Sequence, residues 1–156
     1  MRRRLAALAM ALVAGGCFSS SVVDSMTDPI PEGANRVRLH STLRPAEFFR
    51  QIQQGLISQG YRLATIQESA CYLTTDSKNV GERTGVRMAI TVAETKEGSH
   101  ATISGEWIPI VAIASTVTGE AKWISKFNRF NEQHAFAAMV VALKKIPHER
   151  VEYLTE

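Results

Sequence analysis

Cysteine is scarce in this chain of 156 residues, which contains only Cys17 and Cys71. Two cysteines exclude a disulfide-rich scaffold, and their separation excludes a C-x-x-C redox or zinc motif. A single disulfide is the ordinary expectation for a secreted domain with two cysteines. That expectation requires both thiols to be available, so the chemistry of Cys17 decides it.

Motifs for catalysis, metal binding and nucleotide binding are also missing. No two of the four histidines stand at metal-ligand spacing; they are His40, His100, His134 and His148. The chain has no G-x-S-x-G, P-loop or dinucleotide-binding pattern. We therefore predict no catalytic residue, no metal site and no cofactor. A hydrolase or thiol enzyme is the weaker alternative, because strand alternation places Cys71 on the same buried face as Leu73.

Charge of one sign is not in excess once the first residues are set aside. The formal net charge is +3, from eighteen Lys and Arg and fifteen Asp and Glu. Arg2, Arg3 and Arg4 account for the whole difference. If residues 1–16 are removed, the remaining chain is neutral and has no general attraction for phosphate backbones. Nucleic acid is therefore excluded as the expected partner.

The longest apolar run, from Leu5 to Ala14, is too short to span a membrane comfortably. It follows three arginines and precedes the small residues Gly15 and Gly16, which is the layout of a secretory signal peptide. Two competing interpretations are an ordinary cleaved signal peptide with an incidental cysteine, and a retained transmembrane anchor.

The segment Val13-Ala14-Gly15-Gly16-Cys17 resembles the signal of bacterial lipoproteins, although Ala14 stands where leucine is commonest. The resemblance implies cleavage between Gly16 and Cys17 and alkylation of the Cys17 thiol with diacylglycerol. Acyl chains such as palmitate would anchor the protein to a membrane without spanning it, since each buried methylene adds about 0.8 kcal/mol. Phe18, in place of an aspartate, implies the outer membrane, facing the periplasm. Lipidation would also leave Cys71 without an intramolecular partner.

After the leader, the sequence predicts a tether and one folded domain. Residues 17–35 are rich in Ser, Asp, Pro and Gly and lack periodicity, so they are expected to link the lipid to the domain. Residues 36–156 contain alternating apolar segments and two helical patterns, at 45–60 and 125–146. We expect an α+β domain with the order β-α-β-β-β-β-α, and a short final strand at 150–155 is an option beyond this order. Its antiparallel sheet should have four to five strands, with both helices on one face.

This order is similar to the helix-grip arrangement, in which a long C-terminal helix lies in a curled sheet. Some lipoproteins of the outer-membrane assembly machinery are built in this way. The similarity covers element order alone and rests on no motif, so it concerns the fold and implies no function.

Apolar residues are concentrated in one stretch, residues 107–119. A covered or edge strand is the simpler interpretation, and an exposed flap that touches a partner is the alternative. The candidate interaction surface on this alternative is Trp107, Ile108, Ile110, Val111 and Ile113. A second candidate is a basic face on the last helical segment, formed by Lys122, Lys126 and Arg129, which is either solvated or docks an acidic partner or lipid headgroups.

Two functions follow as hypotheses. The first is a lipid-anchored periplasmic lipoprotein that acts as a non-enzymatic interaction or assembly module of the cell envelope, with an envelope protein as its partner. The second is a carrier or sensor that holds a small apolar molecule between the sheet and the C-terminal helix.

The lipid anchor is directly testable by metabolic labelling with a palmitate analogue. The wild-type chain should incorporate the label, and Cys17→Ser should incorporate none, because only the thiolate is alkylated. Cys71→Ser is the matched control and should label like the wild type. Equal labelling of Cys17→Ser and wild type would contradict the lipoprotein hypothesis.

Overall fold

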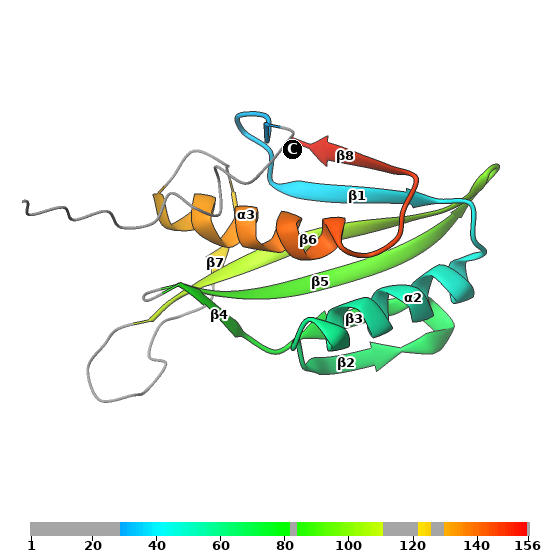
Figure 1. Cartoon of the computed structure of the whole chain (residues 1–156), viewed down its shortest axis with the longest axis horizontal. Helices are drawn as coiled ribbons and strands as arrows, with labels where there is room; N and C mark the ends of the chain where they lie inside the picture. Colours follow the sequence, from blue (N-terminus) through cyan, green and yellow to red (C-terminus); the bar gives the residue numbers. More distant parts are fainter. Residues whose placement is uncertain (1–28, 82–83, 111–121, 126–129, 156) are drawn as a thin grey trace, which may run out of the picture.

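The computed structural model describes residues 29–81, 84–110, 122–125 and 130–155 (Figure 1). The elements in these ranges, in chain order, are β1 (Arg36–Ser41), α2 (Pro45–Ser58), β2 (Leu63–Gln67), the 3-10 turn η1 (Glu68–Ala70), β3 (Tyr72–Thr75), β4 (Lys78–Gly81), β5 (Thr84–Thr95), β6 (Gly98–Pro109), β7 (Lys122–Trp123), α3 (Phe130–Lys144) and β8 (Arg150–Leu154). Eight strands form one sheet in the order β2-β3-β5-β6-β1-β8, with β4 paired to β5 and β7 paired to β6. All of the pairings are antiparallel.

The hairpin of β5 and β6 is the longest ladder of the sheet. Its register runs without a shift from Thr95↔Gly98 to Thr84↔Pro109, so twelve residues of each strand face each other. The two turn residues are Lys96 and Glu97, and Gly98 follows them at the start of β6 with a φ of 137°, which is open mainly to glycine. A Cβ at Gly98 would lie 2.2 Å from the carbonyl oxygen of Ser41. The hairpin end is thus fixed against the end of β1.

Both helices pack on the same face of this hairpin (Figure 1). Pro45 begins α2, where its missing N–H costs nothing, and a helical stripe of apolar residues faces the sheet. This stripe consists of Phe48, Phe49, Ile52 and Leu56, all fully buried. Facing it, the inward residues of β5 alternate with outward ones and are also buried: Val86, Met88, Ile90 and Val92.

The contact between α3 and β6 is close because Gly105 carries no side chain. A Cβ at Gly105 would lie 3.0 Å from Sδ of Met139 and 2.8 Å from Cδ1 of Ile124. Met139 and Leu143 are fully buried beneath the sheet. The described part of this interface is therefore filled by side chains.

The predicted fold class is confirmed: the domain is α+β, and both helices lie on one face of an antiparallel sheet. The predicted number of strands was wrong, since the sheet has eight among the described residues. One unexpected strand, β4, lies in the polar segment 76–85. β4 is held by main-chain hydrogen bonds to β5. Its sequence therefore lacks the alternation of apolar residues by which a strand is recognised. The other, β7, is only two residues long.

Two predicted boundaries were also wrong. Ser125 was expected in the last helix but is not helical, and the described part of that helix, α3, ends at Lys144 and not at Ile146. Lys122 belongs to β7, so it is no part of a basic helical face. Lys126 and Arg129 lie outside the described residues. The folded domain begins before residue 36, because Ala34 is fully buried and the Asn35 N–H donates to the carbonyl oxygen of Leu154 at 2.9 Å.

The hairpin turn generates a test of stability. Gly98→Ala should lower the free energy of unfolding by about 2 to 4 kcal/mol, because it combines a disfavoured φ with a clash against Ser41 and Thr42. Urea denaturation followed by circular dichroism measures the change. Gly81→Ala is the control, since a Cβ at Gly81 meets nothing within 4 Å. Equal midpoints for the two variants would contradict this account of the turn.

Candidate functional site

The face of the sheet opposite the helices carries the candidate site. Because side chains alternate along a strand, the outward residues of neighbouring strands line up in rows set by the register. One row is Arg87 on β5, Glu106 on β6 and Trp123 on β7. The adjacent row runs from Thr65 through Thr74, Ala89 and Ser104. We call this surface the open face.

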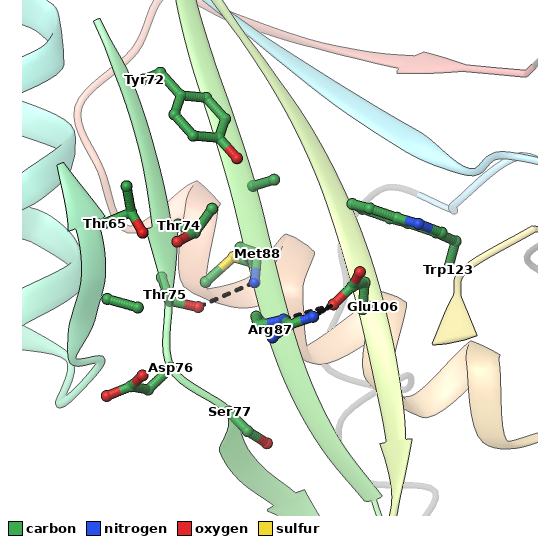
Figure 2. Close-up of a pocket in the computed structure, with 12 residues that line it drawn as sticks. Thr65, Tyr72, Thr74, Thr75, Asp76, Ser77, Arg87, Met88, Glu106 and Trp123 are labelled. Carbon is green, nitrogen blue, oxygen red and sulfur yellow. Dashed lines mark hydrogen bonds and ion pairs between the residues drawn. The ribbon is translucent and has the colours of Figure 1, made fainter. Parts of the chain in front are cut away.

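A pocket of about 370 Å³ hollows the open face between β2–β3 and β6–β7 (Figure 2). Its lining combines hydroxyl groups, one ion pair and two aromatic rings. The residues are Ala64, Thr65, Tyr72, Thr74, Thr75, Asp76, Ser77, Arg87, Met88, Ala89, Glu106 and Trp123. In Figure 2 Tyr72 and Trp123 stand on opposite sides of it, with β5 and β6 between them.

The hollow forms where β3 leaves β5. The ladder between them ends at Thr74↔Ala89, and the chain pairs with β5 again only at Lys78↔Val86. The Thr75 hydroxyl takes the place of a strand carbonyl and accepts the Met88 N–H at 3.0 Å. The intervening residues 76 and 77 are therefore free of the β5 ladder and line one end of the pocket (Figure 2).

The floor of the pocket holds an ion pair. The Arg87 guanidinium contacts the Glu106 carboxylate, and Arg87 Nε donates to Oε2 at 2.5 Å (Figure 2). Glu106 is only 8% exposed, whereas the Arg87 side chain is 44% exposed. A buried carboxylate needs such a partner, because its desolvation is otherwise costly. The pair also fixes the direction of the Arg87 side chain, with its outer part reaching the pocket.

Trp123 is the most exposed large apolar side chain among those described, at 58%. Its position follows from the burial of the residue after it in the chain. The next residue, Ile124, points inward, is 4% exposed, and donates its N–H to the Gly105 carbonyl oxygen at 2.9 Å. Anchoring Ile124 in the core directs the indole of Trp123 outward, beside Glu106 (Figure 2).

A second polar group on the open face joins β1, β6 and β8. His40 Nε2 lies 2.9 Å from Glu152 Oε2 and 3.2 Å from Nη2 of Arg150, and the rings of His40 and His100 have centroids 6.2 Å apart. The pKa of Glu152 is lowered, first by the hydrogen bond with His40 and further by nearby positive charges such as Arg38. Burial lowers the pKa of His100, and Arg38 and His40 add to this. No sequence pattern indicated that His40 and His100 would lie next to each other.

The structure describes three of the five residues of the predicted apolar interaction surface. Trp107 and Ile108 belong to β6 and pair with β5, so an exposed flap is wrong for these two residues. Trp107 is half-buried against the core and Ile108 is 6% exposed. Ile110 follows the strand and is half-buried. Val111 and Ile113 lie outside the described residues.

Cys71 is half-buried rather than buried in a strand, which corrects the predicted position beside Leu73. It ends η1 in a left-handed conformation with φ of 46°, just before β3 begins. Its Sγ lies 3.6 Å from the Glu68 carbonyl oxygen. The lipidation and cleavage residues, Cys17 and Gly16, lie outside the described part of the chain.

Within the described ranges, no group of three or more His, Cys, Asp and Glu side chains could hold a metal ion. No helix among those residues is both long enough and apolar enough to cross a membrane. The chain matches no protein-family model, and a search of curated proteins finds no match to it.

Sequence reasoning missed the pocket because its residues come from five strands. Only the register brings Thr74, Arg87 and Glu106 together, and register is a long-range property. One local signal is present in the sequence: alternation along 85–95 puts Arg87 on the face opposite Val86 and Met88. The two-residue strand of Trp123 offered no alternation from which to place its side chain.

The cluster around His40 generates a pH-dependent prediction. Because the folded-state pKa of Glu152 lies below its ordinary value of 4.5, the carboxylate stabilises the fold above that pH. This contribution is lost as the pH falls through the lowered pKa. At pH 7, Glu152→Gln should reduce the free energy of unfolding by less than about 1 kcal/mol, since the side chain is 39% exposed.

The measurement is urea denaturation of Glu152→Gln and wild type between pH 7 and pH 3. The difference between them should shrink as the pH falls below 4.5. Glu97→Gln, in the exposed hairpin turn, is the control and should leave stability unchanged at each pH. A difference that stays constant down to pH 3 would rule out the stabilising charge.

Proposed function

We propose that this chain is a lipoprotein of the cell envelope, anchored through lipid on Cys17 to the outer membrane and facing the periplasm. Its α+β domain acts as a non-enzymatic interaction or assembly module, and it contacts an envelope partner through the open face of its sheet. The observation that carries the proposal is the pocket beside Trp123, a hollowed surface with an exposed aromatic ring.

The open face is suited to binding because its geometry is rigid. The pocket floor lies on β5 and β6, the longest ladder of the sheet, whose main-chain groups pair with each other. A partner therefore meets fixed side chains and loses little affinity to ordering of the site. Exposed aromatic rings next to polar groups are enriched where proteins bind their partners.

The arrangement of the titratable groups supports binding over catalysis. The buried carboxylate of Glu106 is occupied by Arg87, so the pair acts as an electrostatic anchor and not as an acid beside a base. The thiol of Cys71 stands just before β3, and β5 separates that strand from His100 on β6. At a strand spacing of about 4.8 Å, Cys71 and His100 are two strands, or about 10 Å, apart.

The described packing does not favour the alternative of an apolar carrier. That hypothesis places its ligand between the sheet and the C-terminal helix, where Met139 and Leu143 are fully buried and α3 lies in close contact with Gly105 of β6. The pocket at the open face lies on the other side of the sheet and is lined largely by polar groups. An apolar ligand there would leave buried polar groups without partners.

Site-specific photocrosslinking in intact cells tests the proposal. With p-benzoylphenylalanine in place of Thr65, an exposed residue at the pocket, the full-length protein should form an adduct with an envelope component. Adding Trp123→Ala should reduce the adduct about fivefold or more, because an aromatic contact contributes about 1 kcal/mol.

The matched control places the same crosslinker at Ile57, which is 57% exposed on α2 and does not line the pocket. The variant with the crosslinker at position 57 should not form the adduct that the variant at position 65 forms. The proposal fails if position 65 gives no adduct, or if position 57 gives the same adduct in equal amount.

A further inference from the structure

We propose that the pocket of the open face binds a neutral sugar, with one pyranose ring stacked on Trp123. This inference rests on the proposed function and names the chemical class of the ligand. Three features that line this one pocket carry the inference. They are an exposed indole, several hydroxyl groups, and an ion pair whose charges neutralise each other.

The size and shape of the pocket limit the ligand. Its volume of about 370 Å³ is near the lower end of the range for small-molecule sites, about 300 to 1,000 Å³. The pocket lies on the open face, among outward side chains such as Arg87, Glu106 and Trp123. A ring-sized unit fits within it, and a longer chain of such units could continue across the open face.

The charge of the lining disfavours an anionic ligand. Arg87 is neutralised by Glu106, so its cationic group is not available to pair with a phosphate or carboxylate. Asp76 adds a further negative charge at the pocket. The ionisable lining thus carries one net negative charge, which repels nucleotides and phosphorylated ligands.

The hydrogen-bonding groups match a ligand rich in hydroxyls. Thr65, Thr74 and Ser77 can each donate and accept, whereas the Asp76 carboxylate accepts and the outer N–H groups of Arg87 donate. Such a mixed set satisfies hydroxyl groups, which also both donate and accept. A purely apolar ligand would leave these groups unpaired, at a cost of about 1 to 3 kcal/mol each.

The indole supplies the contact that a sugar needs besides hydrogen bonds. A pyranose ring has a face of C–H groups, and Trp123 presents a large apolar surface directly beside Glu106. Covering it removes apolar area from water. Tyr72 stands on the far side of the pocket with its hydroxyl turned into the hollow (Figure 2). One ring stacks, and hydroxyl groups around its edge reach the polar lining.

An extended peptide is a less suitable occupant. Peptides that bind sheets do so by adding a strand to an open edge, through main-chain hydrogen bonds. Here the pocket lies over β5 and β6, which are internal strands paired on both sides. Glu106 pairs with Arg87 on one side and Trp123 on the other, and in the gap beside β5 the Met88 N–H already donates to the Thr75 hydroxyl, so recognition at this place depends on side chains.

The test uses the full-length protein in a detergent without a sugar headgroup, such as lauryldimethylamine oxide. Saturation-transfer difference NMR with chitotetraose, maltotetraose and cellotetraose should show transfer to ring C–H protons for at least one of them. Isothermal titration should then show that Trp123→Ala weakens that tetrasaccharide about tenfold, and that Trp123→Tyr, which keeps a ring, weakens it less.

Ile57→Ala is the matched control, because it removes an equally exposed apolar side chain from the opposite face and should leave binding unchanged. Near-ultraviolet circular dichroism confirms that each variant is folded. A parallel titration with the corresponding monosaccharide distinguishes a free sugar from a polymeric glycan as the ligand. Equal affinity supports a free sugar as the ligand, and weaker affinity supports a polymeric glycan.

The inference is overturned if none of the three tetrasaccharides shows transfer at millimolar concentration, or if Trp123→Ala binds as well as the wild type. Tighter binding of an anionic sugar such as sialyllactose would also overturn it. If position 65 crosslinks to an envelope protein while no sugar binds, the sugar inference fails and the proposed function stands. If a sugar binds but position 65 forms no adduct in cells, sugar binding by the pocket stands and the proposed contact with an envelope partner fails.

Discussion

The twelve-residue ladder between β5 and β6 is the constraint on which the rest of the structure depends. It is the longest uninterrupted pairing in the sheet, and every other described strand except β2 and β8 pairs directly with one of its two members. Because its register does not shift, every inward residue of β5 and its partner on β6 face the helices together. The same register fixes the rows of outward residues, so one set of main-chain hydrogen bonds positions both the core and the pocket.

The two faces of this hairpin have opposite chemistry. On the inner face, close contacts such as Gly105 against Met139 hold α3 on the sheet and bury its apolar stripe. On the open face, polar residues are kept at the surface, and Glu106, which carries the one buried carboxylate among the described residues, is paired with Arg87. β7 connects the faces, because burial of Ile124 on one side directs Trp123 to the other. Stability on one face therefore positions the proposed binding residue on the other.

Local patterns in the sequence predicted most of the fold. Alternation in 85–95 and 100–108 and the helical stripe around Phe48 are local patterns that the structure contains as β5, β6 and α2, since each arises from neighbouring residues. Two strands were missed for physical reasons: β4 is polar and held by main-chain bonds, and β7 is two residues long. The site was missed because Thr74, Arg87, Glu106 and Trp123 meet only through the sheet register. Cys71 was misplaced because a single left-handed residue interrupts the alternation before β3.

The central claim is that the open face around Trp123 is covered by a partner in the envelope. Hydroxyl-radical footprinting measures this directly, by comparing side-chain oxidation in the purified full-length protein with that in intact envelopes. We expect Trp123 to be oxidised readily in the purified protein and protected in envelopes, while Ile57, equally exposed on α2, reacts alike in both. Equal oxidation of Trp123 in the two samples, or protection confined to Ile57, would contradict the account.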